Sequence, residues 1–440
     1  MGFICSIVGL IMALYFFAKT NRIYNPGTIF SGYWAVIVFL SVINLDNGTP
    51  VRAGTYVLIL FGVLSFAFGC FACMSLRHEI RRSDTYHFEI PDYSILYLIC
   101  ILIILYSAYR LRIIASFLLQ GMSWGQIRLM HGVAGASGAG TLKGGNWSQM
   151  IHDFIVGPCM YMLAPLIPID LFLGRKNRMF LGLSFLAMVT YSLSTVSRAI
   201  WAFSILYLAI VLVIFMRNRT LPRSVRRFLK LIPLFIAFLF LIILLITRSR
   251  SESSQVDLFY NMFAYLTGGI KLFDLHMQEP IAEIRTYGFF TMYGFIYPVF
   301  FVLNYLGIRL FPGIFEDISA IKQSLETFVR ISPHIRMNAY CTLFFNFYND
   351  FGIFGIFLGS FLFGYFCMLA YTYFIRKKNT SSFACYLILV QFMIFSMARI
   401  YTIYTTRALS LVWLFLVFPK DRIRLFRDKG QKLLNIRMHH

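Results

Sequence analysis

The sequence predicts an all-α polytopic membrane protein with about 11–13 transmembrane helices and two long loops on its outer side. Hydrophobic residues make up 59% of the 440 residues and charged residues only 13%, whereas soluble domains contain about 25% charged residues. Apolar runs of bilayer-spanning length, about 20 residues, recur along the whole chain. We therefore expect one membrane-embedded domain over residues 1–440, without separate soluble domains.

The first apolar run, Gly2–Ala18, has no basic residue before it and no small-residue cleavage pattern after it. We therefore interpret it as a membrane helix and not as a signal peptide. The helices expected in the first part of the chain are Phe3–Ala18, Ile29–Leu45, Tyr56–Met74, Tyr93–Tyr109, Met150–Leu173, Phe180–Ser194, Ile200–Met216 and Leu229–Thr247.

The second part of the chain leaves one alternative open. The apolar runs Leu258–Leu275 and Gly288–Leu306 either both cross the membrane or form a re-entrant pair, and both alternatives preserve the orientation of the later helices. Three further helices are expected at Phe351–Ile375, Phe383–Ala398 and Thr402–Phe418.

The basic residues orient the chain in the membrane. Six short stretches between apolar runs hold 23 of the 40 Lys and Arg residues and only three acidic residues. This is the positive-inside pattern of cytoplasmic loops, so we attribute much of the net charge of +22 to topology and anionic lipids, and expect no nucleic-acid partner. The stretches are Lys19–Arg22, Arg77–Arg82, Arg175–Arg178, Arg217–Arg227, Arg376–Lys378 and the basic tail 420–440.

With these stretches inside, two long connections fall outside, at residues 110–149 and 307–339. Loops of this length are often functional. The first has no acidic residue, carries Arg128 among its basic residues, and contains a segment rich in Gly, Ala and Ser from Gly132 to Gly145. We expect this mobile basic loop to close over a ligand.

Several arginines are expected on the outer side, where the positive-inside rule does not account for them: Arg198, Arg248, Arg250, Arg336, Arg399 and Arg407. An excess of arginine there indicates an anionic ligand, because the planar guanidinium donates two parallel hydrogen bonds to a phosphate. The alternative is that each Arg pairs with an acid or extends to lipid headgroups.

Two outer residues are candidates for acid–base chemistry. Asp350 stands at the expected outer start of a helix, where capping is as good an explanation as catalysis. His334 is the second candidate, because histidine titrates near neutral pH. The eight cysteines lie in or beside apolar runs, and the chain has no DxD pair, HExxH or P-loop, so we expect neither a metal site nor a cofactor.

Short segments of the chain resemble the Wzy family of O-antigen polymerases. The strongest runs from Asn338, Ala339 and Tyr340 to Asp350–Phe351–Gly352, similar to the family's N.Y…DFG pattern. Weaker likenesses are Asn25–Pro26 before Trp34, Arg198 after a Ser-rich helix end, and Tyr265 before Gly268–Gly269.

The resemblance implies an enzyme at the periplasmic face of the bacterial inner membrane. Such a glycosyltransferase moves a growing glycan from undecaprenyl pyrophosphate onto a new lipid-linked repeat unit, with membrane lipids and a chain-length regulator protein as partners. We expect Arg198, Arg248, Arg250 and Arg336 to bind the pyrophosphate. Asp350 or His334 would serve the acceptor hydroxyl. The residues expected to contact sugars are Arg128, Asn338 and Tyr340.

Three other functions are compatible with parts of this pattern. An O-antigen ligase uses the same lipid-pyrophosphate donor and differs in its acceptor. A flippase would translocate the same substrate without chemistry, but transporters often consist of repeated halves, and the sequence shows no internal repeat. A non-catalytic scaffold would not need an outer face rich in arginine.

Overall fold

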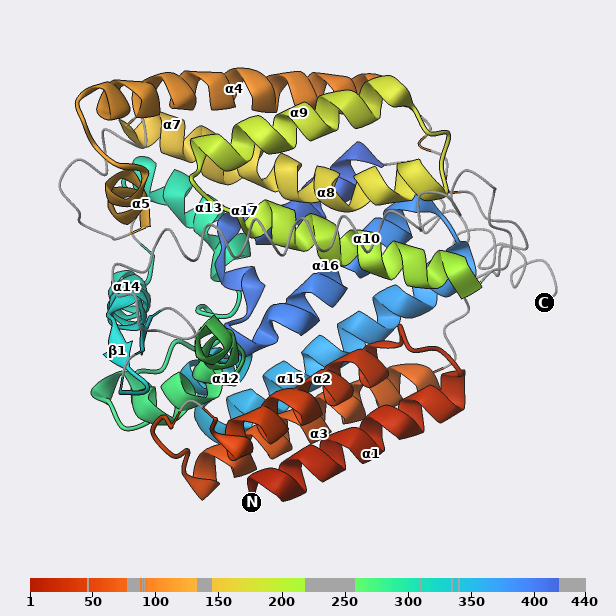
Figure 1. The fold of residues 1–440 in the computed structure, drawn as a ribbon, viewed down its shortest axis with the longest axis vertical. Coiled ribbons are helices and arrows are strands. Elements are labelled where there is room, and N and C mark those ends of the chain that lie inside the picture. Colours follow the sequence, from red (N-terminus) through yellow and green to blue (C-terminus); the bar gives the residue numbers. More distant parts are fainter. Residues whose placement is uncertain are drawn as a thin grey trace.

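The computed structural model describes residues 1–45, 47–76, 88, 90, 92–132, 145–217, 258–308, 310–333, 335–338 and 341–418. These residues form a bundle of helices in which the only strands are two short ones, which confirms the predicted all-α class (Figure 1). The first half consists of α1 (Gly2–Thr20), α2 (Pro26–Ile43), α3 (Ala53–Ser75), α4 (Ser94–Leu119), α5 (Trp124–Gly132), α7 (Gly145–Ile151), the π-helix η1 (His152–Val156), α8 (Gly157–Phe172), α9 (Arg178–Ser194) and α10 (Ala199–Arg217).

The second half begins after residue 257 and ends with the helix that precedes the basic tail. Its elements are α12 (Leu258–His276), the 3-10 helix η2 (Pro280–Ala282), α13 (Tyr293–Tyr305), α14 (Pro312–Glu326), β1 (Val329–Arg330), β2 (Arg336–Met337), α15 (Leu343–Lys377), α16 (Thr380–Ile394), the 3-10 helices η3 (Phe395–Met397) and η4 (Tyr401–Ile403), and α17 (Thr405–Val417).

The helices are those of a multi-pass membrane protein. Among the described residues, seven helical segments are long and apolar enough to cross a bilayer, and four shorter helices are apolar as well. The predicted helix Leu229–Thr247 and the basic tail lie outside the described residues.

Local sequence explains where many helices begin. Asn25 accepts a hydrogen bond from the Gly27 amide and precedes Pro26, the residue best suited to a first helical position. Asn177 and Asn379 cap α9 and α16 in the same way, by accepting from the amides of Phe180 and Ser382.

Glycines allow α3 and α15 to pack backbone to backbone. A Cβ atom on Gly69 would lie 2.0 Å from the carbonyl oxygen of Phe361, and one on Gly364 would lie 2.2 Å from that of Phe66. Both distances are impossible for a real side chain, so glycine at these positions permits the contact. Phe66 also stacks on Phe30 of α2, with the ring centroids 3.8 Å apart, and this contact packs α2 against α3 and α15.

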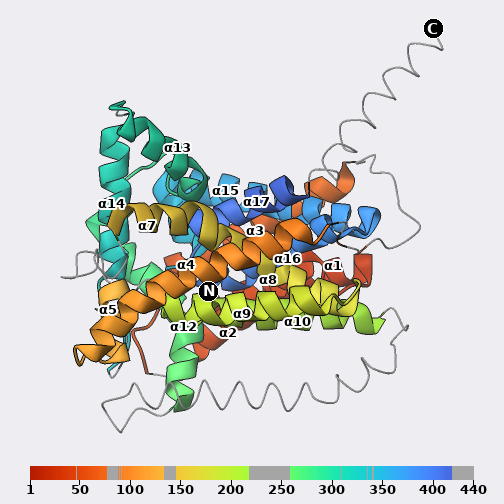
Figure 2. The ribbon, with the colours of Figure 1, turned by 90° about the horizontal axis from the view of Figure 1, so that it is seen from above.

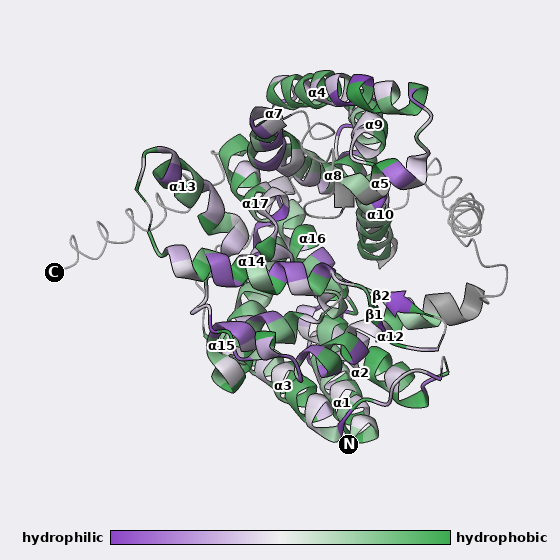
Figure 3. Ribbon diagram, turned by 90° about the vertical axis from the view of Figure 1, so that its left-hand side faces the viewer, coloured by the Kyte–Doolittle hydropathy of each residue, from purple (hydrophilic) through white to green (hydrophobic). Residues whose placement is uncertain are grey.

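The described parts of both long connections lie at one end of the bundle, together with the start of α1. In Figures 1 and 2, α5, α14 and α12 gather at this end, and α12 runs across the direction of the other helices. Figure 3 looks onto it and shows hydrophilic residues on α14 and β2. We call this the loop end.

The connections contain more helix than expected. α4 continues to Leu119, so Arg110 is a buried helical residue and not the first residue of a loop. The predicted second loop, 307–339, contains α14 and an antiparallel hairpin in which Val329 pairs with Met337. The amphipathic sequence of α14 explains its order, because Ile318, Ile321 and Leu325 are buried.

The helix expected to start at Phe351 begins earlier, at Leu343, and is kinked at the expected start. Phe351 and Gly352 leave helical geometry there, and Gly352 has φ 64° and ψ −144°, a conformation that favours glycine. The carboxylate of Asp350 accepts from Thr286, Phe290 and Thr291, not from amides of its own helix. Capping of α15 by Asp350 was therefore the wrong interpretation.

Candidate functional site

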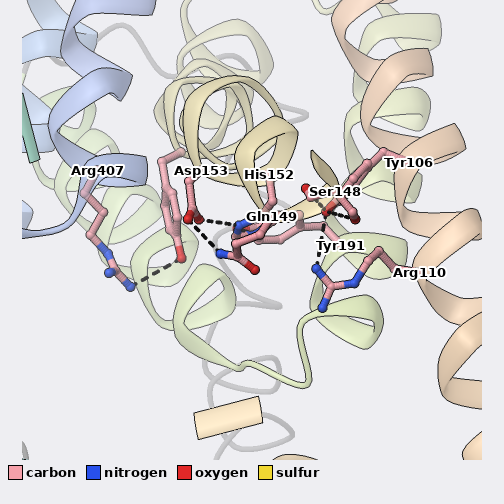
Figure 4. A network of polar contacts seen from close by, with 9 residues as sticks. Tyr106, Arg110, Ser148, Gln149, His152, Asp153, Tyr191 and Arg407 are labelled. Atoms are coloured by element: carbon pink, nitrogen blue, oxygen red, sulfur yellow. Dashed lines mark hydrogen bonds and ion pairs between the residues drawn. The ribbon is translucent and has the colours of Figure 1, made fainter. Parts of the chain in front are cut away.

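A short π-helix at the loop end places two polar side chains inside the bundle. η1 joins α7 to α8, and its first two residues are His152 and Asp153. Single π-helical turns inside α-helices are rare and frequently mark functional sites. Figure 4 shows His152 and Asp153 between Tyr106 and Arg110 of α4 on one side and Arg407 of α17 on the other.

His152 is held at both ring nitrogens. Its Nδ1 lies 2.8 Å from Asp153 Oδ1, and its Nε2 lies 3.2 Å from the hydroxyl of Tyr191, on whose ring it also stacks. Gln149 donates to the other carboxylate oxygen of Asp153 at 2.7 Å. A carboxylate that orients an imidazole in this way favours proton acceptance at the far nitrogen.

Hydrogen bonds extend this network to α4. The hydroxyl of Tyr106 donates to the carbonyl oxygen of Ser148 at 2.9 Å and accepts from Arg110 at 3.3 Å. The Arg110 side chain is only 1% exposed. A guanidinium inside a membrane protein is costly, and such residues commonly serve function.

On the other side of η1, Arg407 lies in an aromatic cage. Its guanidinium carbon is 4.8 Å from the ring centroids of both Tyr161 and Tyr401 and 4.6 Å from that of Tyr404. One terminal nitrogen donates to the Tyr161 hydroxyl at 3.3 Å, while Nε is buried without a hydrogen-bond partner among the described residues. The cage stabilises the cation by cation–π contact and leaves donor capacity unused.

Two further cations lie next to this cage. The guanidinium of Arg399 is 5.2 Å from the ring centroid of Tyr404, the same ring that Arg407 contacts. Lys322 of α14 places its ammonium 3.2 Å from the ring centroid of Tyr293. Burial, and next the charge of Arg399, lower the pKa of Lys322 to about 7. We call Lys322, Arg399 and Arg407 the cationic cluster.

The cationic cluster and the His152–Asp153 pair belong to one site. Trp413 of α17 donates to the carbonyl oxygen of Phe154 at 2.9 Å, which fixes α17 against η1. Asp153 also interacts electrostatically with Tyr293, the ring under Lys322.

Two of the three cations lie against aromatic rings, and Glu326 adds an electrostatic attraction to Lys322. Within the described part of the chain, no carboxylate forms an ion pair with Lys322 or Arg407. Burial lowers the pKa of Lys322 and the repulsion between like charges lowers it further, so an anion that bound between these groups would be stabilised. Phosphate fits the chemistry best, because guanidinium and ammonium groups are its usual ligands.

The residues predicted from sequence are distributed differently. Asp350 is buried at the kink of α15 and fully engaged by the hydrogen bonds given above. Asn338 donates to the carbonyl oxygen of Glu326, and Arg198 lies in the turn between α9 and α10. Arg336 is exposed on β2, directly opposite Arg330.

The remaining predicted residues fall on other parts of the chain. Arg248, Arg250, His334 and Tyr340 lie outside the described residues, and Arg128 lies on α5 with its side chain outside them. The predicted groups that are described thus occupy the α9–α10 turn, β2 and the residue after it, and the α15 kink. The α9–α10 turn begins one helical turn after Tyr191.

The sequence marks Arg399 and Arg407 as outer arginines but does not place them in the site. His152, Asp153 and Lys322 were not proposed as site residues from the sequence. A usable signal was present, because His152–Asp153 falls inside the apolar run expected at Met150–Leu173, where charge is costly.

Comparison of the chain with protein-family models, curated proteins and solved structures gives no match.

Proposed function

We propose that this protein polymerises lipid-linked oligosaccharide repeat units. It transfers the growing glycan from undecaprenyl pyrophosphate onto a new lipid-linked repeat, at the periplasmic face of the bacterial inner membrane. The observation that carries the proposal is the cationic cluster next to the His152–Asp153 pair, at the loop end of the bundle.

The two halves of the site match the two charges that the reaction develops. As the bond between the donor sugar and the pyrophosphate breaks, negative charge grows on the leaving phosphate, where Arg399, Arg407 and Lys322 stabilise it. The acceptor hydroxyl replaces that of Tyr191 at Nε2 of His152, forms the new glycosidic bond, and passes its proton to this nitrogen. Asp153 stabilises the resulting imidazolium, and the lipid pyrophosphate leaves with the electron pair.

This proposal moves the acceptor base from Asp350 or His334 to His152. The Asp350 carboxylate is occupied by one hydroxyl and two backbone amides, a structural arrangement that favours a role in holding the 286–291 segment. Arg198, Arg248, Arg250 and Arg336 remain proposed phosphate ligands, and Arg128, Asn338 and Tyr340 remain proposed sugar contacts. Arg336 gains support from Arg330, which adds a second cation directly opposite it.

A gel of surface lipopolysaccharide tests the proposal in a strain that lacks this gene. We expect the long ladder to collapse to core plus one repeat unit, because repeat units are still made, flipped and ligated. A strain that shows only bare core would contradict polymerisation and support a ligase or flippase. An unchanged ladder would exclude a role in O-antigen synthesis.

Complementation then tests the site. We expect Arg407→Gln to leave the ladder collapsed at normal protein level, because the cage loses its cation. Arg112→Gln is the matched control: Arg112 is an exposed arginine on α4, outside the network, and this variant should restore the full ladder.

A further inference from the structure

A long apolar groove runs along α15 toward the end opposite the loop end. Its walls come from α13, α15, α16 and α17, and its volume is about 790 Å³. Leucine and phenylalanine side chains dominate its middle, among them Leu358, Leu362, Leu389, Leu411 and Phe415. Leu362 and Phe415 are 41% and 45% exposed, so the groove opens toward the lipid-facing surface of the bundle.

The groove is longer than one leaflet of a bilayer. Phe347 and Asp350 line it before the kink of α15, and from Phe351 to Lys377 its lining extends about 39 Å at the helical rise of about 1.5 Å per residue. The hydrocarbon core of a whole bilayer is only about 30 Å thick. An acyl chain that remains in one leaflet therefore fills less than half of the groove, whereas a long polyprenyl chain can occupy all of it.

One end of the groove adjoins the cationic cluster. Thr291 and Thr402 line that end and are joined by a hydrogen bond from the Thr402 hydroxyl to the Thr291 carbonyl oxygen. Ile400, which comes directly after Arg399, also lines it, and Leu411 lies one helical turn after Arg407. Lys377 lines the opposite end of the groove, so the choice between the two ends rests on the proposed function: a lipid-linked substrate that reacts at the cationic cluster carries its phosphate toward Arg399 and Arg407.

We propose that this groove binds the polyprenyl chain of a lipid-linked substrate whose phosphate lies at the cationic cluster. The inference rests on the proposed function for the identity of the chain, and on charge and length for its placement. Cations near both ends of the groove favour an anionic headgroup, and the length favours a polyprenyl chain over the acyl chains of a phospholipid.

Photo-crosslinking with a sugar-free probe tests this placement without requiring catalysis. The full-length protein is placed in nanodiscs of phosphatidylethanolamine and phosphatidylglycerol with a long-chain polyprenyl phosphate that carries a benzophenone. Peptide mapping should locate the crosslinks on α15 and α16. Unlabelled long-chain polyprenyl pyrophosphate should compete much more strongly than farnesyl pyrophosphate, whose short chain leaves most of the groove empty, and added phosphatidylglycerol should not compete.

A matched pair of variants sharpens the test. Leu362→Trp fills the rim of the groove and should lower crosslinking about tenfold, the effect of overpacking an occupied site. Leu98→Trp adds the same side chain on α4, where Leu98 is 67% exposed and does not line the groove, and should leave crosslinking unchanged. Both variants should retain the melting temperature of the wild type.

Two results would overturn the inference. Crosslinks scattered over the lipid-facing residues of α1 and α4 would show that the groove does not select the chain, and equal competition by phosphatidylglycerol would show a phospholipid site. The proposed function can fail separately. If the probe crosslinks in the groove but the protein makes no polymer, the groove is a polyprenyl site and the protein is not a polymerase.

Discussion

At the scale of single residues, the proposed reaction depends most on His152. Its two nitrogens contact Asp153 and Tyr191, so removal of the imidazole removes the proposed proton acceptor. We expect His152→Ala to lower the rate of polymer formation by about 10²–10⁴-fold, the range for loss of a general base. The rate is measured with purified protein and lipid-linked repeat units.

Tyr191→Phe is the control for this prediction. It keeps the stacked ring beside His152 and the proposed proton acceptor and removes only the hydroxyl, so its rate should fall much less than that of His152→Ala. A His152→Ala protein that is folded and as active as the wild type would show that the base lies elsewhere.

The lowered pKa of Lys322 predicts that binding of a phosphate ligand depends on pH. This pKa of about 7 means that the neutral form dominates above that pH, and a neutral amine does not attract phosphate. Binding of inorganic pyrophosphate should therefore weaken as pH rises from 6 to 8, approaching about a tenfold loss per pH unit at most. Calorimetric titration of the wild type and of Lys322→Met measures this, and the variant should bind weakly with a flatter profile.

The lowered pKa of Lys322 affects stability in the opposite direction: binding of pyrophosphate weakens as pH rises, whereas the folded protein becomes more stable. Between pH 7 and the ordinary lysine pKa of 10.5, the unfolded chain binds more protons at this residue than the folded chain does. Lys322 therefore lowers the free energy of unfolding most at and below pH 7, and this penalty decreases as pH rises through that window. An equally pH-dependent Lys322→Met protein would contradict the assignment.

At the scale of elements, substitution of Asp350 tests whether its carboxylate has a structural or a catalytic role. Asp350→Asn keeps the shape but weakens acceptance from Thr286, Phe290 and Thr291, which should lower the free energy of unfolding by about 1–3 kcal/mol. Pyrophosphate affinity should remain that of the wild type. A stable variant without activity would instead return Asp350 to the catalytic site.

The close packing of α3 against α15 leads to a second prediction at this scale, which concerns stability. Gly364→Ala forces a methyl group against the backbone of Phe66 and should destabilise the protein by about 1–3 kcal/mol, as overpacking does. Gly182→Ala in α9 is the control, because nothing lies within 4 Å of the added Cβ and alanine favours helix. Thermal unfolding in detergent compares the two variants, and equal melting temperatures would contradict the packing.

At the scale of the whole molecule, hydropathy was enough to predict the class and most helices. A bilayer span requires an apolar run, so the runs at Phe3–Ala18 and Phe180–Ser194 closely match α1 and α9. The helical extension of α4, the order within 307–339 and the early start of α15 were not predicted, because polar residues there are stabilised by tertiary contacts.

The site was harder to predict for the same reason. Arg399 and Arg407 flank Tyr401 and Tyr404 in the sequence, whereas Lys322 comes from α14 and only the fold brings it to Tyr293 and to the two arginines. The π-helical turn that places His152 beside Asp153 has no sequence pattern of its own. The outer arginines were identified by type and side, but their grouping required the structure.

Reconstituted polymerisation tests the central claim most directly. Purified protein in proteoliposomes is supplied with synthetic undecaprenyl-pyrophosphate-linked repeat units, and the products are resolved on a gel. We expect a ladder of lengthened glycans with the wild type and with Arg112→Gln, and only the starting unit with Arg407→Gln. A wild-type protein that leaves the units unjoined, or an Arg407→Gln protein that makes the full ladder, would contradict the claim.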